Sequence, residues 1–327
     1  MKRLNVLKLS AVILTTLALG FVGGYIVGGL PLRGLVPFME RTSEWSIGIY
    51  TGDYPLNLTP VPGINPVLTG RDVTDVDAKY VADPFLVRTE AGWYMFFEVM
   101  ERNTQQGSIG LASSQDGLHW SYERIVLDEP FHLSYPQVFE WEGQYYMLPE
   151  TNQAHSVRLY RAVDFPHSWQ LASLLFPGAY VDPTIIRHNE LWWIFVKPRG
   201  HPESHVNLYF ADTLAGPWQL HPQSLIERHT DDIGRKGGRI TKAGGNIYKF
   251  VQDRYPIYGS RLWAFAIEEL TTTSYVERLA LTVPVIEASG SGWNADGMHH
   301  VDPQLTGDGG WIVAVDGKQR HWRFGLR

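Results

Sequence analysis

Short apolar runs recur along the chain, and each run follows a polar residue and a proline. The runs span residues 93–97, 145–148, 192–196 and 311–315, and the dipeptides before them are Asp83-Pro84, Tyr135-Pro136, Asp182-Pro183 and Asp302-Pro303. Runs of this length, rich in aromatic and β-branched residues and bounded by turn residues, are typical of β-strands. The pattern therefore predicts a chain of repeated β-units.

The spacing of this motif indicates the number of units. Its prolines lie 52, 47 and 120 residues apart, and the last interval leaves room for one more unit. That unit is visible as Gly237-Gly238-Arg239 followed by the apolar run 247–251. Five units of about 45 to 65 residues, each with strand and turn signals, predict an all-β fold, a five-bladed β-propeller.

The motif also predicts where polar side chains lie in the propeller. A proline cannot donate a hydrogen bond to a β-ladder, so it is tolerated at the first residue of a strand. The first strand of each blade lines the central channel of a propeller. We therefore expect five residues at equivalent inner-strand starts around one channel: Asp83, Tyr135, Asp182, Arg239 and Asp302.

The first unit shows the strands of one blade most clearly. Its apolar segments predict strands at 85–88, 93–99, 109–113 and 120–127, with a turn at Asp116-Gly117 between the last two. The fifth unit runs out of chain soon after its second and third strands. Residues 45–50 are a strand signal left over near the N-terminus, and we expect them to complete the fifth blade and close the ring.

A second polar position recurs at the end of each second strand. Alignment of the apolar runs places Glu98, Glu150, Lys197, Gln252 and Asp316 there. These residues either form an inner rim around the pocket or mark the point where each strand reaches water. For Lys197 and Asp316 we favour the second interpretation, because strand ends are usually polar. For Glu150 we favour the site, because its apolar neighbours can raise the pKa of a carboxyl group.

The N-terminal segment differs from the rest of the chain. Lys2, Arg3 and Lys8 precede residues 9–30, which contain no charged side chain. A helix of about 22 residues spans roughly 33 Å, enough to cross a hydrocarbon core of about 30 Å. We expect a single transmembrane signal anchor with its basic flank over 1–30, a tether over 31–44 and the propeller over 45–327. A cleaved secretory signal is the alternative.

The basic flank predicts the orientation of the anchor. Basic residues tend to stay on the cytoplasmic side of a membrane helix, and here a basic cluster precedes the apolar segment. We therefore expect a single-pass membrane protein whose propeller lies on the extracytoplasmic side.

Composition limits the class of protein. Of the 327 residues, 44% are hydrophobic and 13% aromatic, and 32 Gly with 20 Pro indicate a turn-rich β domain. The chain has no cysteine, which excludes a disulfide framework and a thiolate metal site. The net charge of −6 and the lack of a long basic run argue against nucleic acid as a partner.

The predicted channel combines carboxyl groups with aromatic side chains, which is typical of sites that bind or cleave glycans. Cleavage of a glycosidic bond uses one carboxylic acid to protonate the leaving oxygen and one carboxylate as base or nucleophile. The alternative explanation is local, because Asp often stabilises a turn through bonds to its own backbone. Three Asp-Pro motifs and Glu150 on one channel favour the site.

Three histidines stand near the expected channel entrance. His299 and His300 come shortly before Asp302, and His132 comes shortly before Tyr135. Neutral imidazoles with a carboxylate can bind a metal, but these residues show no recognisable ligand spacing. We therefore predict contacts with sugar hydroxyls, and no metal or other cofactor.

Several motifs together resemble known families. They are 131–136 (Phe-His-Leu-Ser-Tyr-Pro), 147–150 (Met-Leu-Pro-Glu), Gly237-Gly238-Arg239, Gln252-Asp253, Tyr258-Gly259 and 299–302 (His-His-Val-Asp). The Asp-Pro blade starts resemble the five-bladed propellers of glycoside hydrolase family 43 and its relatives. The combination, over residues 45–325, is more similar to the N-terminal propeller domain of glucosamine inositolphosphorylceramide transferases.

The resemblance to family 43 implies roles for the carboxyl groups. By this resemblance, Asp83 is similar to the catalytic base of that family. Asp182 is similar to the family's second Asp, which orients and tunes the catalytic groups. Where that family has its general-acid Glu, this chain has Gly237-Gly238-Arg239, so Glu150 or Asp302 would have to supply the acid. In the transferases, the glycosyltransferase fold lies in a separate C-terminal domain without a counterpart in this sequence. Transferase activity is therefore not carried over.

Two hypotheses of different classes follow. The first is a membrane-anchored, hydrolase-like enzyme acting on glycosidic bonds of a polysaccharide or glycolipid, with Asp83, Asp182, Glu150 and Asp302 as catalytic residues. The alternative is a non-catalytic glycan-binding propeller, or an accessory domain that partners a separate glycosyltransferase. In both, the residues expected to bind sugar are Glu98, His132, Tyr135, Arg239, Gln252, Asp253, His299 and His300.

The hypotheses predict different geometry. Two carboxyl groups roughly 5 to 10 Å apart across an open pocket favour the enzyme, whereas an arginine that fills this space favours binding. A third hypothesis is a scaffold whose propeller face binds protein, because a fold does not fix function. Channel carboxyl groups without a pocket would favour that scaffold.

Overall fold

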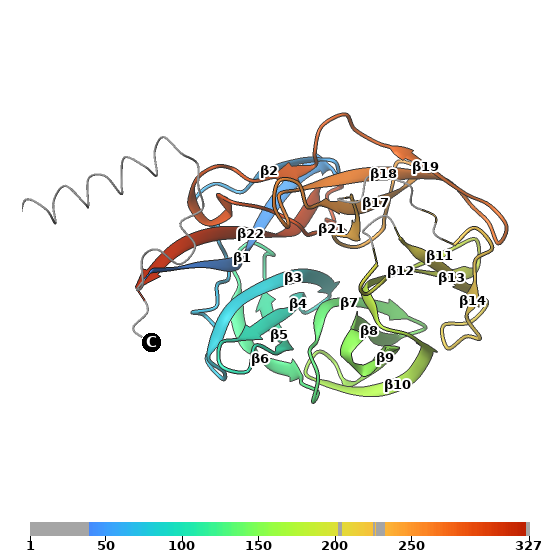
Figure 1. Ribbon diagram of the computed structural model, residues 1–327, viewed down its shortest axis with the longest axis horizontal. Coiled ribbons are helices and arrows are strands. Elements are labelled where there is room, and N and C mark those ends of the chain that lie inside the picture. The colour runs from blue at the N-terminus through green and yellow to red at the C-terminus, as the bar shows by residue number, and fades with distance from the viewer. Residues whose placement is uncertain (1–38, 202–204, 225, 227–232, 325–327) are drawn as a thin grey trace, which may run out of the picture. The chain divides into compact units, whose positions relative to one another are not determined.

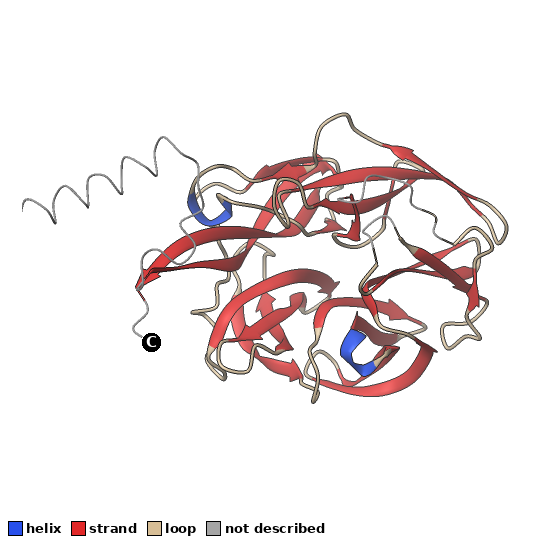
Figure 2. Ribbon diagram, in the orientation of Figure 1, coloured by secondary structure: helices blue, strands red, loops and turns tan. Residues whose placement is uncertain are grey.

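Five antiparallel sheets follow the five units expected from the sequence (Figure 1). The computed structural model describes residues 39–201, 205–224, 226 and 233–324. These residues form mainly strands and turns, with two short 3-10 helices, η1 (Asn152–Ala154) and η2 (Gly292–Asn294) (Figure 2). The predicted all-β, five-bladed propeller is therefore confirmed.

The chain divides into two units, one of Ser43–Arg320 and one of Met1–Thr42 with His321–Arg327. The five blades belong to the part Ser43–Arg320, apart from the ends of two strands at residues 39–42 and 321–324. The anchor predicted over 1–30 lies outside the described residues, and the first strand begins inside the predicted tether, at Met39. In the part of the chain that the structure describes, no helix has the length and apolar character needed to span a bilayer.

Three blades are built from consecutive strands. The first contains β3 (Ala78–Thr89), β4 (Gly92–Glu101), β5 (Gly107–Ser114) and β6 (Ser121–Leu127). The second contains β7 (Ser134–Trp141), β8 (Gln144–Glu150), β9 (Ser156–Asp164) and β10 (Ser168–Pro177). The third contains β11 (Tyr180–His188), β12 (Leu191–Pro198), β13 (Asn207–Ala211) and β14 (Gln219–Leu220). The strands expected in the first unit are thus confirmed, within one to several residues at their ends.

The fourth blade is irregular at its inner edge. β15 (Ile233–Lys236) and β16 (Thr241–Ala243) both pair with β17 (Asn246–Asp253). β17 pairs with β18 (Arg261–Leu270), which pairs in turn with β19 (Tyr275–Leu279) and β20 (Ile286–Glu287). The prediction that the inner strand of this blade starts at Gly237-Gly238-Arg239 is therefore wrong, because these residues lie in the break between β15 and β16.

The fifth blade joins the two ends of the propeller. Its strand order is β2–β1–β22–β21, with β1 (Met39–Tyr54), β2 (Asn57–Pro60), β21 (Val301–Leu305) and β22 (Trp311–Phe324). The expectation that residues 45–50 close the ring is confirmed. The fifth sequence repeat supplies two strands of this blade, β21 and β22, rather than the three expected. The other two strands, β1 and β2, come from the N-terminal side of the propeller.

The proline motifs of the first three blades lie at bulges, and Asp83 is well inside its strand rather than at the start. The register of β3 with β4 shifts between Ala82 and Phe85, and similar shifts occur around Tyr135 in β7 and Asp182 in β11. These three residues have positive φ angles, between 47° and 53°. A β-bulge leaves its extra residue unpaired. The following proline is therefore tolerated there even without an N–H group.

The apolar runs lie between blades and are buried on both faces. In β4, Met95 and Phe97 pack in a cluster with Ile47 and Ile312 of the fifth blade, whereas Phe96 packs in a cluster with residues of the second blade. All three β4 side chains have no exposed surface. A strand buried on both faces has no polar alternation, which explains the continuous apolar runs of the sequence.

Gly237 and Gly238 allow the fourth blade to approach the fifth. The N–H of Val301 donates to the carbonyl of Gly237 at 2.8 Å. Gly238 has a φ of +132°, and a Cβ atom added there would lie 1.7 Å from the carbonyl oxygen of Val301. Gly238 belongs to the Gly237-Gly238-Arg239 segment that stands where glycoside hydrolase family 43 has its general-acid Glu. Backbone packing therefore requires glycine at this position.

Gly238→Ala is expected to lower the free energy of unfolding by at least about 2 kcal/mol, because both its φ angle and the contact with Val301 oppose a side chain. Gly245 is a matched control in the same blade, with a φ of +80° and nothing within 4 Å of an added Cβ. Gly245→Ala is expected to cost only about 1 kcal/mol. Denaturant unfolding of the full-length chain measures both, and equal losses would contradict the close approach.

Candidate functional site

Two adjoining cavities lie among the inner strands. The inner one has a volume of about 170 Å³ and the outer one about 380 Å³, and both are lined by Met100, His132, Glu150 and Arg235. The remaining inner wall consists mainly of carboxyl and aromatic residues: Trp45, Tyr80, Ala82, Asp83, Glu98, Ser134, Tyr258 and His299. Asp83 and Glu98 of the first blade and Glu150 of the second blade meet at the inner cavity. Of the five residues expected around one channel, Asp83 is the one that lines it.

At the bulges of β3 and β11, the backbone N–H groups of Asp83 and Asp182 bond to the preceding blade. The N–H of Asp83 donates to Oδ2 of Asp316 at 3.2 Å, and the N–H of Asp182 donates to Oε2 of Glu150 at 3.1 Å. Asp316 lies in β22, and Glu150 ends β8. In both cases a carboxylate of a second strand, which follows the apolar run, accepts from the bulge residue of the next blade, so this second-strand position is part of the site.

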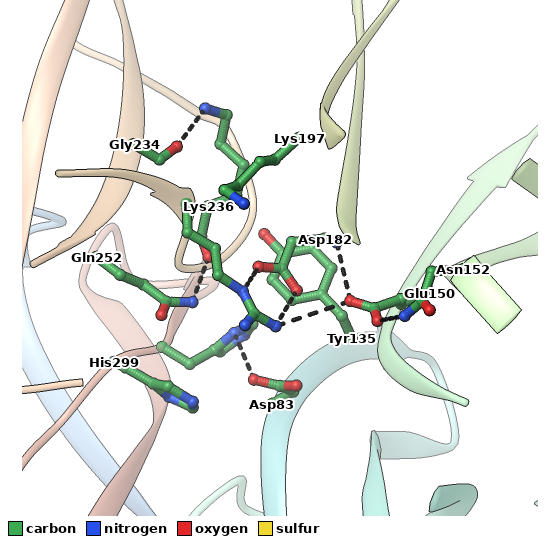
Figure 3. A network of polar contacts seen from close by, with 12 residues as sticks. Asp83, Tyr135, Glu150, Asn152, Asp182, Lys197, Gly234, Lys236, Gln252 and His299 are labelled. Atoms are coloured by element: carbon green, nitrogen blue, oxygen red, sulfur yellow. Dashed lines mark hydrogen bonds and ion pairs between the residues drawn. The ribbon is translucent and has the colours of Figure 1, made fainter. Parts of the chain in front are cut away.

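Arg235, in β15, occupies the space between Asp182 and Glu150. Its Nη2 donates to Oδ1 of Asp182 at 3.1 Å and lies 3.7 Å from Oε2 of Glu150, while its Nε donates to the other oxygen of Asp182. Asn152 donates through Nδ2 to Oε1 of Glu150. Figure 3 shows Asp182 and Glu150 turned toward this shared region, with Asn152 beside Glu150. An arginine therefore fills the gap between these two carboxyl groups.

Burial raises the pKa of the carboxyl groups in the inner cavity. Burial is the main cause for Asp83, whose pKa is raised to about 7, with His299 lowering it and Asp316 raising it. The pKa of Glu98 is raised well above its usual range by burial and then by the negative charges of Asp83 and Glu150. The pKa of Glu150 is raised to about 8 by burial and Asp182, against the opposing effect of Arg235. The upward shift expected for Glu150 is thus present.

His299 is held between an aromatic ring and a carboxylate. Its Nδ1 lies 2.8 Å from Oδ1 of Asp316, and its ring stacks on Trp45 with 4.0 Å between the centroids. Asp83, His299 and Asp316 each offer one ligand atom, and these atoms lie within 4.8 Å of one another. This group could hold a divalent cation, so the expected lack of a metal remains a prediction.

Several predicted site residues do not line either cavity. They are Tyr135, Asp182, Arg239, Gln252, Asp253, His300 and Asp302. Asp182 contacts the cavity lining through the guanidinium of Arg235 and through its own N–H, which donates to Glu150. Asp302 accepts from Nε of Arg239 at 2.7 Å and from the N–H of Leu86 at 2.6 Å. The carboxyl group of Asp302 is therefore bonded to the first blade, which indicates a structural role.

The other residues outside the cavities also make internal contacts. The Tyr135 hydroxyl accepts from the N–H of Gly238 at 2.8 Å and lies 2.9 Å from Oγ1 of Thr184. Nε2 of Gln252 donates to the carbonyl of Lys236 at 2.6 Å. Asp253 accepts from Nε of Arg261 at 2.8 Å and from Nε1 of Trp263 at 3.1 Å. These contacts join strands within and between the blades, and the three residues line neither cavity.

His300 differs from these residues. It is fully buried against Phe85 and Tyr135, and neither ring nitrogen has a hydrogen-bond partner within the described ranges. Its Nδ1 lies 3.7 Å from Oδ1 of Asp83. Burial lowers the pKa of His300 to about 4, so the ring is neutral at neutral pH.

Sequence reasoning missed Arg235 and set aside Asp316 and Lys197. Asp316 is 0% exposed and Lys197 is 6% exposed, so the interpretation that their strands reach water is wrong. For these two residues the alignment of second strands already contained the signal. Arg235 has no counterpart at the repeated positions, so the pattern offered no signal for it.

Solved structures share the fold at low sequence identity. The catalytic domain of the GH62 α-L-arabinofuranosidase of Coprinopsis cinerea is 10% identical and has a TM-score of 0.57, over 84% of this chain and 98% of that chain. An exo-1,5-α-L-arabinanase from a bovine ruminal metagenomic library is 15% identical and has a TM-score of 0.52, over 73% of this chain and 93% of that chain. These similarities show the propeller fold alone.

Sequence comparison shows the family. Glucosamine inositolphosphorylceramide transferase 1 of Oryza sativa subsp. japonica is 35% identical over 300 residues, 85% of this chain and 40% of the relative. The Arabidopsis thaliana protein of the same name is 34% identical over 303 residues, 85% of this chain and 39% of the relative. The chain thus spans about 40% of the length of these curated relatives. The model of the glucosamine inositolphosphorylceramide transferase 1 N-terminal family matches residues 39–318, and the chain belongs to that family.

Proposed function

We propose that this chain is a glycan-recognition propeller that binds the head group of a glycolipid without cleaving it and works beside a separate glycosyltransferase. The observation that carries the proposal is the position of Arg235 between Asp182 and Glu150. Hydrolysis needs open space between two carboxyl groups for the scissile bond, and for water in inverting enzymes. A bound arginine takes that space and offers hydrogen-bond donors to a ligand instead.

The two residues expected to supply the acid are both engaged. Oε1 of Glu150 accepts from Asn152, and Oε2 accepts from the N–H of Asp182. Asp302 is bonded to Arg239 and to the N–H of Leu86. A general acid must direct its proton toward the leaving oxygen of the substrate. Both carboxyl groups are instead held by donors of the protein itself, which favours binding over hydrolysis.

The names of the relatives support one class of ligand. The relatives are named glucosamine inositolphosphorylceramide transferases, and a lipid of that name with a sugar attached is a glycolipid. Carboxyl, imidazole and aromatic side chains in the inner cavity suit the hydroxyl groups of a sugar or an inositol ring. We therefore assign the cavity to the polar head of such a lipid, and the partner to the enzyme that transfers its sugar.

The location of the chain is part of the proposal. The uncharged segment 9–30 with its basic flank would hold the propeller at a membrane surface, where a lipid head group is accessible. The flank favours the extracytoplasmic side.

Protease added to intact cells or spheroplasts is expected to digest the propeller, because this orientation exposes it outside the cytoplasm. A cytoplasmic protein serves as the control and should remain intact until the cells are lysed. Full protection of the propeller before lysis, with digestion afterwards, would contradict the orientation.

Asp83→Asn is expected to weaken glycan binding by roughly 1 to 3 kcal/mol, the scale of a charge-assisted hydrogen bond. Asp83 lines the inner cavity, and Asn keeps its shape while it removes the charge. Asp116→Asn is the matched control, because Asp116 lies in the exposed turn between β5 and β6. The full-length chain in mild detergent is screened on an array of inositolphosphorylceramide glycosides and neutral oligosaccharides.

Two results would contradict this proposal. One is release of sugar by the wild type that is lost in Asp83→Asn, which would favour a hydrolase. The other is a wild-type chain that binds no glycan or glycolipid on the array.

Glu98→Gln is expected to reduce the pH dependence of stability. Because the pKa of Glu98 is raised in the folded state, the folded state binds more protons than the unfolded state above a pH of about 4.3. The free energy of unfolding should therefore fall as pH rises from about 5 through neutral pH, and less steeply in Glu98→Gln. Denaturant unfolding across this range measures the slope. An unchanged slope, or the same effect from Glu142→Gln in the exposed β7–β8 turn, would contradict the burial of this charge.

A further inference from the structure

The outer cavity has a basic wall, in contrast to the inner one. Lys197, Arg199 and Arg235 line it, and Glu150 is its one carboxyl residue among the described lining. Two of the cations come from one segment, because β12 ends at Pro198 between Lys197 and Arg199. The inner cavity has the opposite balance, with Asp83, Glu98 and Glu150 against Arg235.

Arg199 is the cation of this wall that is most available to a ligand. It is exposed, and its Nη1 donates to Oδ1 of Asn152 at 2.8 Å. Asn152 is a neutral partner, and within the described ranges no carboxylate lies within ion-pair distance of the Arg199 guanidinium. The other end of the Asn152 amide donates to Glu150. Asn152 therefore orients Arg199 beside the boundary of the two cavities.

Arg235 and Arg199 both act on the charge of His132 at this boundary. His132 lines both cavities, and its pKa is lowered to about 4 by burial and then by Arg235 and Arg199. A third cation is thus disfavoured there at neutral pH, whereas an anion would be stabilised by the same charges.

The volumes indicate how a ligand would divide between the cavities. Small-molecule sites usually have about 300 to 1,000 Å³. The outer cavity, at about 380 Å³, lies in this range, and the inner one, at about 170 Å³, is smaller. The inner cavity can hold part of a ligand, such as one polyol ring, and the rest of the ligand has to extend past His132 and Arg235 into the basic cavity.

We propose that the outer cavity is a phosphate subsite, which binds a phosphate ester carried by the same polyol or sugar whose hydroxyl groups enter the inner cavity. The proposal rests on the glycan-binding function proposed above and specifies its ligand. A phosphate ester presents several charged oxygens in different directions, which suits cations that approach from separate elements. A carboxylate would be satisfied by one guanidinium.

The test uses the full-length chain in mild detergent and three solutes: myo-inositol, myo-inositol 1-phosphate and inorganic phosphate. Calorimetry is expected to show that myo-inositol 1-phosphate binds about tenfold more tightly than either of the others, because both cavities are occupied. This preference over myo-inositol should decrease as salt is added, since it depends on charge.

Arg199→Gln is expected to remove most of the preference for myo-inositol 1-phosphate over myo-inositol. Arg199→Lys, which keeps the charge and loses the planar fork, is expected to keep part of it. Arg161→Gln is the matched control, because Arg161 is exposed on β9 and lines neither cavity. A thermal unfolding curve for each variant shows that it is folded.

The outcomes separate this inference from the proposed function. If the glycan array is positive but myo-inositol 1-phosphate binds no more tightly than myo-inositol, the phosphate subsite is overturned and glycan recognition stands. Equal losses of preference in Arg199→Gln and Arg161→Gln also overturn the subsite. If the array is silent and none of the three solutes binds, both the proposed function and the subsite fail.

Discussion

The site depends on the positive-φ bulges that precede the prolines of the first three blades. A residue other than glycine costs about 1 to 3 kcal/mol in this conformation, and Tyr135, with a bulky side chain, is the most unusual of them. The bulge turns the N–H groups of Asp83 and Asp182 toward the second strand of the preceding blade, where Asp316 and Glu150 accept them. An unpaired buried N–H would itself cost about 1 to 3 kcal/mol. The same bonds that join neighbouring blades therefore fix the carboxyl groups of the cavities.

One arginine changes what these carboxyl groups can do. In glycoside hydrolases a pair of carboxyl groups faces an open space that receives the scissile bond. Here Arg235 enters from the fourth blade and pairs with Asp182 beside Glu150. The fourth blade can place it there because its inner strand is broken at Gly237 and Gly238, where the backbone approaches Val301. The loss of the expected acid and the gain of the arginine are thus two aspects of one irregular blade.

The repeat in the sequence was sufficient for the fold, because each blade buries both faces of its second strand and so produces the same apolar run. It was also sufficient to align Glu98, Glu150, Lys197 and Asp316. The bulges could not be predicted, because Asp-Pro fits a strand start as well as a bulge and only the neighbouring blade decides between them. Asp302 illustrates this limit, since it carries the same dipeptide but pairs in regular register with Ala314 and bonds to Arg239. Arg235 could not be predicted because its role arises from contacts with two other blades.

The closure of the ring by strands from both ends of the chain constrains how the protein is synthesised. β1 begins at Met39 and its partner β22 begins at Trp311. At about 5 to 20 residues per second, a ribosome needs roughly 15 to 55 s to make the chain between them. During that time β1 and β2 form a two-stranded ribbon without their sheet, and such ribbons are marginally stable in water. The nascent chain therefore carries an unpaired edge until β22 has been synthesised, and a chaperone or the translocation machinery would be expected to shield it.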